Sequence, residues 1–258
     1  MGFIQKLFAR RKVLHARPAD LEMQRIAFSG NSDDSCGCLQ SVNSDVGNTE
    51  PQLHTEIQNI ECEGWKLMLS LVHKAEIEKC QEFAPGLEFS PALWSQIITL
   101  PPSIARLKSV KKLYLYGSHL VRVPPEIGEM VNLEEFDAYR SYRLHWLPFE
   151  ISRCAKLKRS RLSTRALYGN RKYRPPFPRL GVEAVNLGEA PVNCSVCNQS
   201  LPGNKSLQVW ISLRIATDVM PLMVNACSKE CIGRLPTPEQ GYVDHPHCGG
   251  LELKQPPR

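Results

Sequence analysis

The sequence has no long apolar run. Its 258 residues include no uninterrupted apolar stretch of about 18 residues, the length that a membrane-spanning helix needs. Residues 1–12 are basic and amphipathic, but Gln5, Lys6 and Arg10 interrupt the apolar core that a secretory signal requires. These absences argue against helical membrane spans and against secretion, so we expect a cytoplasmic protein.

Signatures of catalysis are also missing. The chain contains no Gly-rich phosphate loop, no Ser-His-Asp set and no paired catalytic carboxylates that stand out. Its net charge is modest, +6 from 32 Lys and Arg against 26 Asp and Glu, and does not by itself indicate nucleic-acid binding. We therefore expect a protein that binds and does not catalyse.

Two segments, residues 1–60 and residues 61–85, precede the part of the sequence that repeats. Residues 27–60 are rich in Ser, Asn, Asp and Gly and show no helical or strand period, so we predict a flexible N-terminal segment over residues 1–60. From Trp65 to Ala75, apolar residues recur at three- and four-residue spacing, which predicts an amphipathic helix. We expect this helix, within residues 61–85, to cover the open end of the region that follows.

From Leu100 the sequence repeats itself. The pairs Leu100-Pro101, Val123-Pro124 and Leu147-Pro148 follow one another at 23 and 24 residues. Other apolar positions keep this period, including Ile104, Ile127 and Ile151, and Val110, Leu133 and Leu157. One such unit cannot bury its own leucines, so neighbouring units must stack.

This pattern resembles the leucine-rich-repeat family in its Leu-Pro form, over roughly residues 90 to 170. The resemblance implies an α/β fold with a short leucine-rich-repeat solenoid and an N-terminal capping helix. The solenoid spans residues 86–180 and includes a connector at residues 165–178. Three positions depart from the family pattern. Ser118 and Ser141 stand where the family usually has Asn, and Ser160 stands where the earlier units have Leu113 and Phe136.

A binding surface is expected on the strand face opposite the leucines. The side chains that alternation directs to this face are Lys112, Tyr114, Tyr116, Glu135, Asp137, Tyr139, Arg159 and Arg161. Tyrosine and arginine are enriched where proteins bind one another, so this face predicts a protein partner. The alternative is that these are ordinary solvated strand positions.

Four of the ten cysteines form two close pairs within residues 185–250. Cys194 and Cys197 are separated by two residues, and Cys227 and Cys231 by three, which predicts a closed four-thiolate zinc site. A turn, a hairpin and a helix that carries the last pair resemble the treble-clef zinc-finger group, which implies a small α+β zinc-binding module after the solenoid. The alternatives are reduced core cysteines or a disulfide, and His245, His247 and Cys248 offer a weaker second metal site.

The leading functional hypothesis is a non-catalytic protein–protein adaptor with structural zinc. One alternative is a ubiquitin-ligase-like effector, but RING domains usually use eight ligands, and no cysteine here begins a Cys-x-Asp motif. The other is nucleic-acid binding through the zinc module and the basic segment from Lys156 to Arg174, where Tyr168 and Tyr173 are interleaved.

Overall fold

The computed structural model describes residues 50–181, 183–185, 187–188, 192–201 and 206–257. Over these residues the protein is a mixed α/β structure with a four-stranded parallel sheet, a three-stranded sheet and a few short helices. None of the described helices is long and apolar enough to cross a membrane. The predicted basic stretch at residues 1–12 and the rest of the N-terminal segment up to residue 49 lie outside the described residues.

The parallel sheet follows the sequence period. Its strands, in spatial order, are β1 (Glu82–Phe83), β2 (Lys112–Tyr114), β3 (Glu135–Ala138) and β5 (Arg159–Leu162). Leu113 pairs with Phe136, and Phe136 with Ser160, so residues one period apart lie side by side. Short 3-10 helices return the chain between strands: η3 (Pro102–Arg106), η4 (Pro125–Glu129) and η5 (Phe149–Arg153). Each begins directly after a proline, which has no backbone N–H to donate.

The apolar rows of the sequence pattern form the core. Ile104, Ile127 and Ile151 are completely buried, one from each of these three 3-10 helices. Leu113 and Phe136 are buried on the adjacent strands. The core therefore lies between the sheet and its returning helices.

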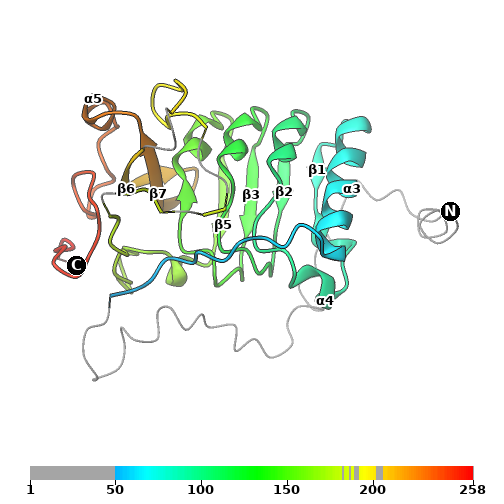
Figure 1. Ribbon diagram of the computed structural model, residues 1–258, viewed down its shortest axis with the longest axis horizontal. Coiled ribbons are helices and arrows are strands. Elements are labelled where there is room, and N and C mark those ends of the chain that lie inside the picture. The colour runs from blue at the N-terminus through cyan, green and yellow to red at the C-terminus, as the bar shows by residue number, and fades with distance from the viewer. Residues whose placement is uncertain (1–49, 182, 186, 189–191, 202–205, 258) are drawn as a thin grey trace, which may run out of the picture.

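Helix α3 (Glu63–Ile77) lies at the β1 end of the parallel sheet (Figure 1). Its apolar stripe, from Trp65 to Ala75, is buried as the spacing predicts. The helix is shorter than the predicted range of 61–85 because the chain turns after Glu78, where Lys79 adopts a left-handed conformation. The chain then forms β1, η2 (Pro85–Leu87) and α4 (Pro91–Trp94).

Serine side chains lie inside the turns that follow the strands. The hydroxyls of Ser118 and Ser141 are 2.6 Å apart, and Ser141 Oγ donates to the carbonyl of Leu115 at 3.1 Å. Ser163 continues the series by accepting the backbone N–H of Arg140 at 2.7 Å. Hydroxyl groups thus satisfy buried backbone groups from one turn to the next.

The opposite end of the molecule is a second sheet of β4 (Leu147–Pro148), β7 (Asp218–Ala226) and β6 (Leu207–Ile215). The strands β6 and β7 form the predicted antiparallel hairpin, and β7 also pairs in parallel with β4. A single cluster of buried apolar side chains extends from Trp65 in α3 to Cys231 in the last helix. The hairpin therefore completes the core at the end away from α3 (Figure 1).

Ser160 marks the junction between the two sheets. Its Oγ donates to Asp218 Oδ2 at 2.7 Å and accepts the backbone N–H of Asp218 at 3.1 Å. Its backbone carbonyl accepts the Thr217 hydroxyl at 2.7 Å. The polar residue in place of Leu113 and Phe136 is thus explained by its contact with the β6–β7 turn. The chain between β5 and the hairpin includes η6 (Thr164–Ala166).

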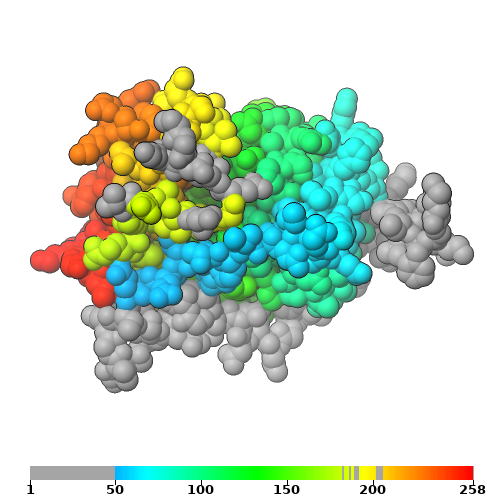
Figure 2. Space-filling view, in the orientation of Figure 1, coloured from blue at the N-terminus to red at the C-terminus, as the bar shows by residue number. Residues whose placement is uncertain are grey.

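Residues 53–58, which we call the strap, correct the predicted limit of the flexible segment. The strap crosses one face of the molecule (Figure 2, blue). Gln58 donates to the carbonyl of Gln96 at 3.0 Å and accepts the N–H of Ile98 at 2.9 Å. Sequence composition did not reveal these contacts, because a polar side chain that binds backbone groups leaves no apolar period.

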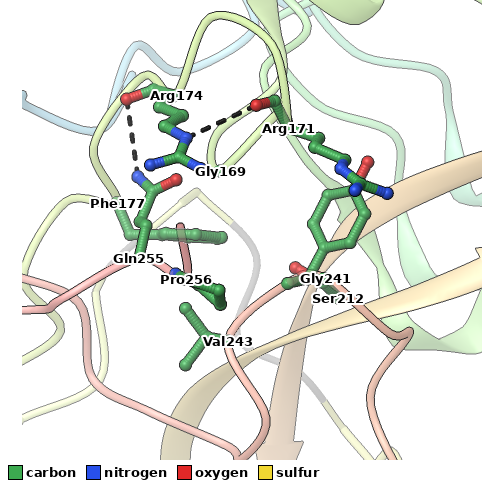
Figure 3. Close-up of a pocket in the computed structure, with 10 residues that line it drawn as sticks. Gly169, Arg171, Arg174, Phe177, Ser212, Gly241, Val243, Gln255 and Pro256 are labelled. Atoms are coloured by element: carbon green, nitrogen blue, oxygen red, sulfur yellow. Dashed lines mark hydrogen bonds between the residues drawn. The ribbon is translucent and has the colours of Figure 1, made fainter. Parts of the chain in front are cut away.

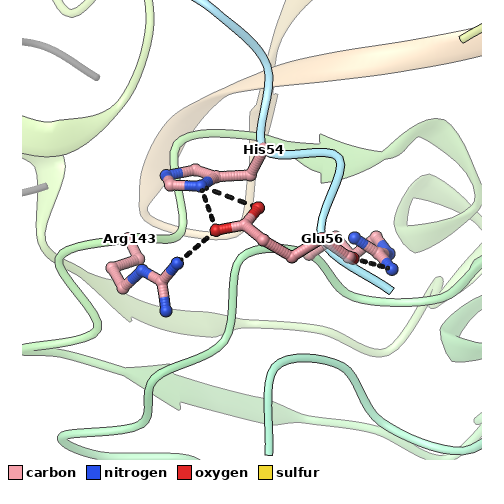
Figure 4. Close-up of polar contacts among 4 residues, drawn as sticks. His54, Glu56 and Arg143 are labelled. Atoms are coloured by element: carbon pink, nitrogen blue, oxygen red, sulfur yellow. Dashed lines mark hydrogen bonds and ion pairs between the residues drawn. The ribbon is translucent and has the colours of Figure 1, made fainter. Parts of the chain in front are cut away.

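The middle of the strap is held by charged and aromatic side chains. The carboxylate of Glu56 lies between His54 and the guanidinium of Arg143 (Figure 4). The backbone carbonyl of Glu56 accepts from Arg122 at 2.8 Å. The His54 ring stacks on His145, with centroids 5.4 Å apart. The strap therefore contacts several successive turns of the parallel-sheet region.

Candidate metal centre and binding face

The first pair of cysteines lies on a tight turn. The Cys194 N–H donates to the carbonyl of Gln199 at 2.8 Å, and the Asn198 N–H to the carbonyl of Cys194 at 3.0 Å. Asn198 has φ of 59°, a left-handed conformation that asparagine tolerates better than most residues. An isolated bridge between Asn193 and Ser200 closes the turn, which brings Cys194 and Cys197 to the same side.

The second pair lies where β7 meets the last helix, α5 (Lys229–Gly233). Cys227 follows the end of β7, and Cys231 is within α5. Ser228 caps this helix, because its Oγ accepts the backbone N–H of Cys231 at 3.3 Å. The short helix thereby turns Cys231 toward Cys227, and their Sγ atoms are 3.5 Å apart.

The turn with Cys194 is attached through Ser195 to β7 and to the 3-10 helix η5. The Ser195 Oγ accepts the backbone N–H of Asn225 in β7 at 2.9 Å, and its N–H donates to the Asn225 carbonyl at 2.8 Å. The Ser195 carbonyl accepts from Arg153, the last residue of η5, at 2.8 Å. Neither contact could be read from the cysteine spacing, since both partners are distant in sequence.

The four thiols form one cluster. The ligand atoms of Cys194, Cys197, Cys227 and Cys231 all lie within 4.8 Å of one another, and Cys197 Sγ is 3.6 Å from Cys227 Sγ. In a tetrahedral site with Zn–S bonds of about 2.3 Å, the sulfurs are separated by roughly 3.8 Å. The cluster therefore has the size of a four-thiolate metal site, and none of these cysteines forms a disulfide.

The acidities of these thiols favour a bound cation. Burial raises the pKa of Cys194, but the backbone N–H groups of Cys197, Cys227 and Val196 outweigh burial and lower it to about 6. The neighbouring thiols of Cys231, Cys197 and Cys194 raise the pKa of Cys227 to about 12. One thiolate forms readily while its negative charge opposes ionisation of the next. A divalent cation would remove this opposition.

The remaining described cysteines have different environments. Burial raises the pKa of Cys154 to about 11, and its Sγ donates to the carbonyl of Ile127. Burial likewise raises the pKa of the Cys80 thiol. Cys62 is the N-cap of α3 and accepts the N–H of Trp65. Raised pKa values suit packing at Cys154 and Cys80, since a nucleophile needs an accessible thiolate.

The weaker second metal site is not assembled among the described residues. His247 is buried against Phe177, with ring centroids 4.6 Å apart, whereas exposed His245 pairs with Asp244. Cys248 is exposed and belongs to no close group of metal-ligating side chains within the described part of the chain. The prediction for these three residues is therefore not supported.

Six residues of the predicted binding face lie in rows across β2, β3 and β5, and Tyr116 and Tyr139 follow the ends of β2 and β3. Lys112, Glu135 and Arg159 are register partners, and Tyr114, Asp137 and Arg161 form the next row. The rings of Tyr116 and Tyr139 follow, with centroids 6.0 Å apart. The period thus places these eight side chains next to one another.

Exposure along this face is uneven. Tyr114, Tyr116 and Asp137 are buried, with exposed fractions of 8%, 7% and 4%, so the expectation that the whole face meets solvent is wrong. The Tyr116 ring packs on Tyr139, and its hydroxyl forms a hydrogen bond with Arg140. Lys112 and Glu135 are half-buried, and Lys112 forms an ion pair with Glu82 at 2.7 Å.

The exposed part of the face is at the β5 end. Arg159 and Arg161 are exposed, and Tyr139 has an exposed fraction of 36%. The guanidinium of Arg161 lies 4.5 Å from the centroid of the Tyr139 ring, and it is 3.7 Å from Asp137. This stacked pair offers a flat aromatic and cationic surface held in place by a buried carboxylate.

No protein-family model matches the chain, and no curated protein is similar to it.

Proposed function

We propose that this chain is a non-catalytic protein–protein interaction adaptor. In the proposal, the parallel sheet and its returning helices are a short leucine-rich-repeat solenoid capped by α3, and the four cysteines hold a structural zinc ion. The domain limits, 86–180 and 185–250, then separate two functional regions that share a core. Thiols that stay reduced fit a cytoplasmic location for the protein.

The stacked pair of Tyr139 and Arg161 carries the binding part of the proposal. An arginine fixed over an aromatic ring has already lost much of its side-chain entropy, so less is lost when a partner binds. Arg159 extends the same exposed edge. The binding surface proposed is therefore narrower than the eight residues of the sequence pattern and centres on Tyr139, Arg159 and Arg161.

The cysteine cluster supports a structural metal. Four thiols supply every ligand of a tetrahedral ion, which leaves no position for a substrate or an activated water. Cys194, Cys197, Cys227 and Cys231 would hold the ion, and its role would be to join the turn at Cys194 to β7 and α5. Zinc is the metal we propose, because two close cysteine pairs are typical of its structural sites.

The binding proposal is tested by comparing the proteins retained by purified wild-type chain and by a Tyr139→Ala, Arg161→Ala variant. We expect a defined partner to bind the wild type and be lost from the variant. The matched control is Tyr173→Ala, Arg165→Ala, which removes another arginine–tyrosine stack, 5.1 Å apart, on the connector. The same partners on all three proteins would contradict the proposal.

The same comparison distinguishes protein binding from the alternative of nucleic-acid binding. If the connector variant loses bound material that nuclease also removes, the basic segment from Lys156 to Arg174 is the binding element. Protein retained by the wild type and by the connector variant, but not by the Tyr139 variant, supports the adaptor.

The metal proposal has its own measurement. We expect one zinc per chain in protein purified under reducing conditions, and its loss from a Cys227→Ser, Cys231→Ser variant. Protein that contains no metal when purified in this way and then fails to take up zinc would rule out the structural site.

A further inference from the structure

A hollow outside the proposed binding face lies beside the connector. It is bordered by the turn at residues 170–174, the loop around Gly241 and the C-terminal residues near Gln255. Arg171 and Arg174 extend from the same turn along two sides of this hollow (Figure 3). Phe177, Val243 and Pro256 supply apolar walls.

The turn that carries both arginines is held by hydrogen bonds. The Arg174 N–H donates to the carbonyl of Asn170 at 2.7 Å, and the Asn170 side chain accepts the N–H groups of Lys172 and Tyr173. Gln255 donates to the carbonyl of Arg174, which ties the turn to the C-terminal residues. The two arginines therefore start from a defined backbone.

The Arg171 side chain is positioned by Gly241. A Cβ atom built on Gly241 would lie 3.4 Å from Nη1 of Arg171, so the guanidinium rests against this glycine. Gly241 has φ of 83°, which other residues adopt only with strain. The Arg174 Nε donates to the carbonyl of Arg171 at 3.4 Å, so the second guanidinium is also oriented.

No acidic group within the described ranges neutralises these two charges. Neither Arg171 nor Arg174 has an ion pair there. The two acids of the neighbouring loop are occupied, because Glu239 pairs with Arg214 at 2.8 Å and Asp244 with His245 at 2.7 Å. Exposed Lys172 and Lys254 flank the same region and add positive charge.

We propose that this hollow binds a phosphoryl group. Two guanidinium groups suit a dianion because each presents paired N–H donors to two oxygens. The apolar walls limit solvent around the anion and strengthen this attraction. The hollow is small, so an anion that it holds must itself be small, such as free phosphate or the phosphoryl group of one side chain.

The test is a titration followed by backbone amide NMR at low salt, with inorganic phosphate and with a blocked phosphoserine as probes. We expect saturable shifts at the amides of Gly169 and Gly241 in the wild type. An Arg171→Gln, Arg174→Gln variant should bind about tenfold more weakly or worse, because both charge-assisted contacts are lost.

The matched control removes two positive charges far from the hollow. Lys66 and Arg106 are exposed near α3 and form only loose ion pairs, so Lys66→Gln, Arg106→Gln should leave binding unchanged. Equal binding by all three proteins, or shifts spread over other basic surfaces, would show general charge attraction and overturn the proposal.

The two probes identify the source of the phosphoryl group. Tighter binding of blocked phosphoserine would show that the walls contact the stem of a phosphorylated side chain. Equal affinity for the two probes would assign the site to free phosphate. Neither result depends on Tyr139 or Arg161. The phosphoryl-binding proposal can therefore be confirmed or contradicted independently of the proposed adaptor face.

Discussion

The parallel sheet and the cysteine region share one core but depend on different interactions. The sheet is held by rows of fully buried side chains, such as Ile104, Ile127 and Ile151, which are spread evenly along it. The cysteine region depends on a polar turn and on α5, which has five residues and is too short to be stable alone. Loss of a single interaction, such as the bound metal, should therefore disturb the cysteine region more than loss of one apolar contact disturbs the sheet.

Metal removal should have the largest effect and should be local. A chelator in reducing buffer should increase amide exchange at α5 and around Cys194, while β2 and β3 stay protected. Structural zinc sites link on the order of 10 kcal/mol of binding free energy to folding. Cys248→Ser, which changes a cysteine outside the cluster, is the control and should keep the metal. Unchanged exchange at α5 after chelation would remove the contrast between the two regions.

A core truncation in the sheet should affect the whole molecule. Phe136 is completely buried on β3, so Phe136→Ala should lower the free energy of unfolding by about 3–5 kcal/mol. Because the core is continuous, we expect one cooperative transition in urea, shifted to lower concentration. Val131→Ala, at a half-exposed site, should have little effect. Two separate transitions, of which only one moves, would contradict a shared core.

Mild acid should weaken the contact between the strap and the sheet. Burial lowers the pKa of His145 to about 4 even though its Nδ1–H donates to the carbonyl of Ala166 at 2.6 Å. Between about pH 6.5 and pH 4 the unfolded chain binds more protons than the folded one, so stability falls as the pH falls. The loss from this residue should be on the order of 3 kcal/mol by pH 4.

His145→Asn isolates this effect because it retains an N–H donor for the Ala166 carbonyl and does not titrate. Urea unfolding of both proteins at pH 7 and pH 4.5 should show a smaller pH dependence in the variant. An identical pH dependence would show that His145 does not contribute, since metal release from the cysteines is common to both proteins.

The smallest effect is expected at the junction of the two sheets. Ser160→Ala removes the hydroxyl that contacts Asp218, and should lower the free energy of unfolding by about 1 kcal/mol because the partly buried Asp218 loses these hydrogen bonds. Ser103→Ala is a matched control, because the buried Ser103 hydroxyl has no hydrogen-bond partner. Thermal unfolding of both variants gives the comparison, and equal shifts would show that Ser160 does not join the sheets.

Periodic features were the ones that sequence could predict. The 23- and 24-residue spacings match the register that pairs Leu113, Phe136 and Ser160, because parallel strands align equivalent residues. The spacing of the cysteines likewise anticipated a single cluster, since each pair is brought together by local turns. In both cases the signal comes from residues that are close in sequence or evenly repeated.

Contacts between distant segments could not be predicted in this way. The two-residue strand β1 carries too few residues to show an alternating pattern. Burial of Tyr114 and Tyr116 depends on what covers the strand face, and strand alternation says nothing of it. The hollow between Arg171 and Arg174 requires the loop at Gly241 and the C-terminal residues, which lie far along the chain.

The strap has a consequence for how the molecule can evolve in length. Gln58, Glu56 and His54 reach Ile98, Arg122 and His145, which precede Leu100, Val123 and Leu147 by one or two residues. The contacts of the strap thus recur once in each 23- or 24-residue period. Insertion or deletion of one period would place part of the strap opposite residues that it does not now contact. A change in the number of periods would therefore require a matching change in the length of the strap.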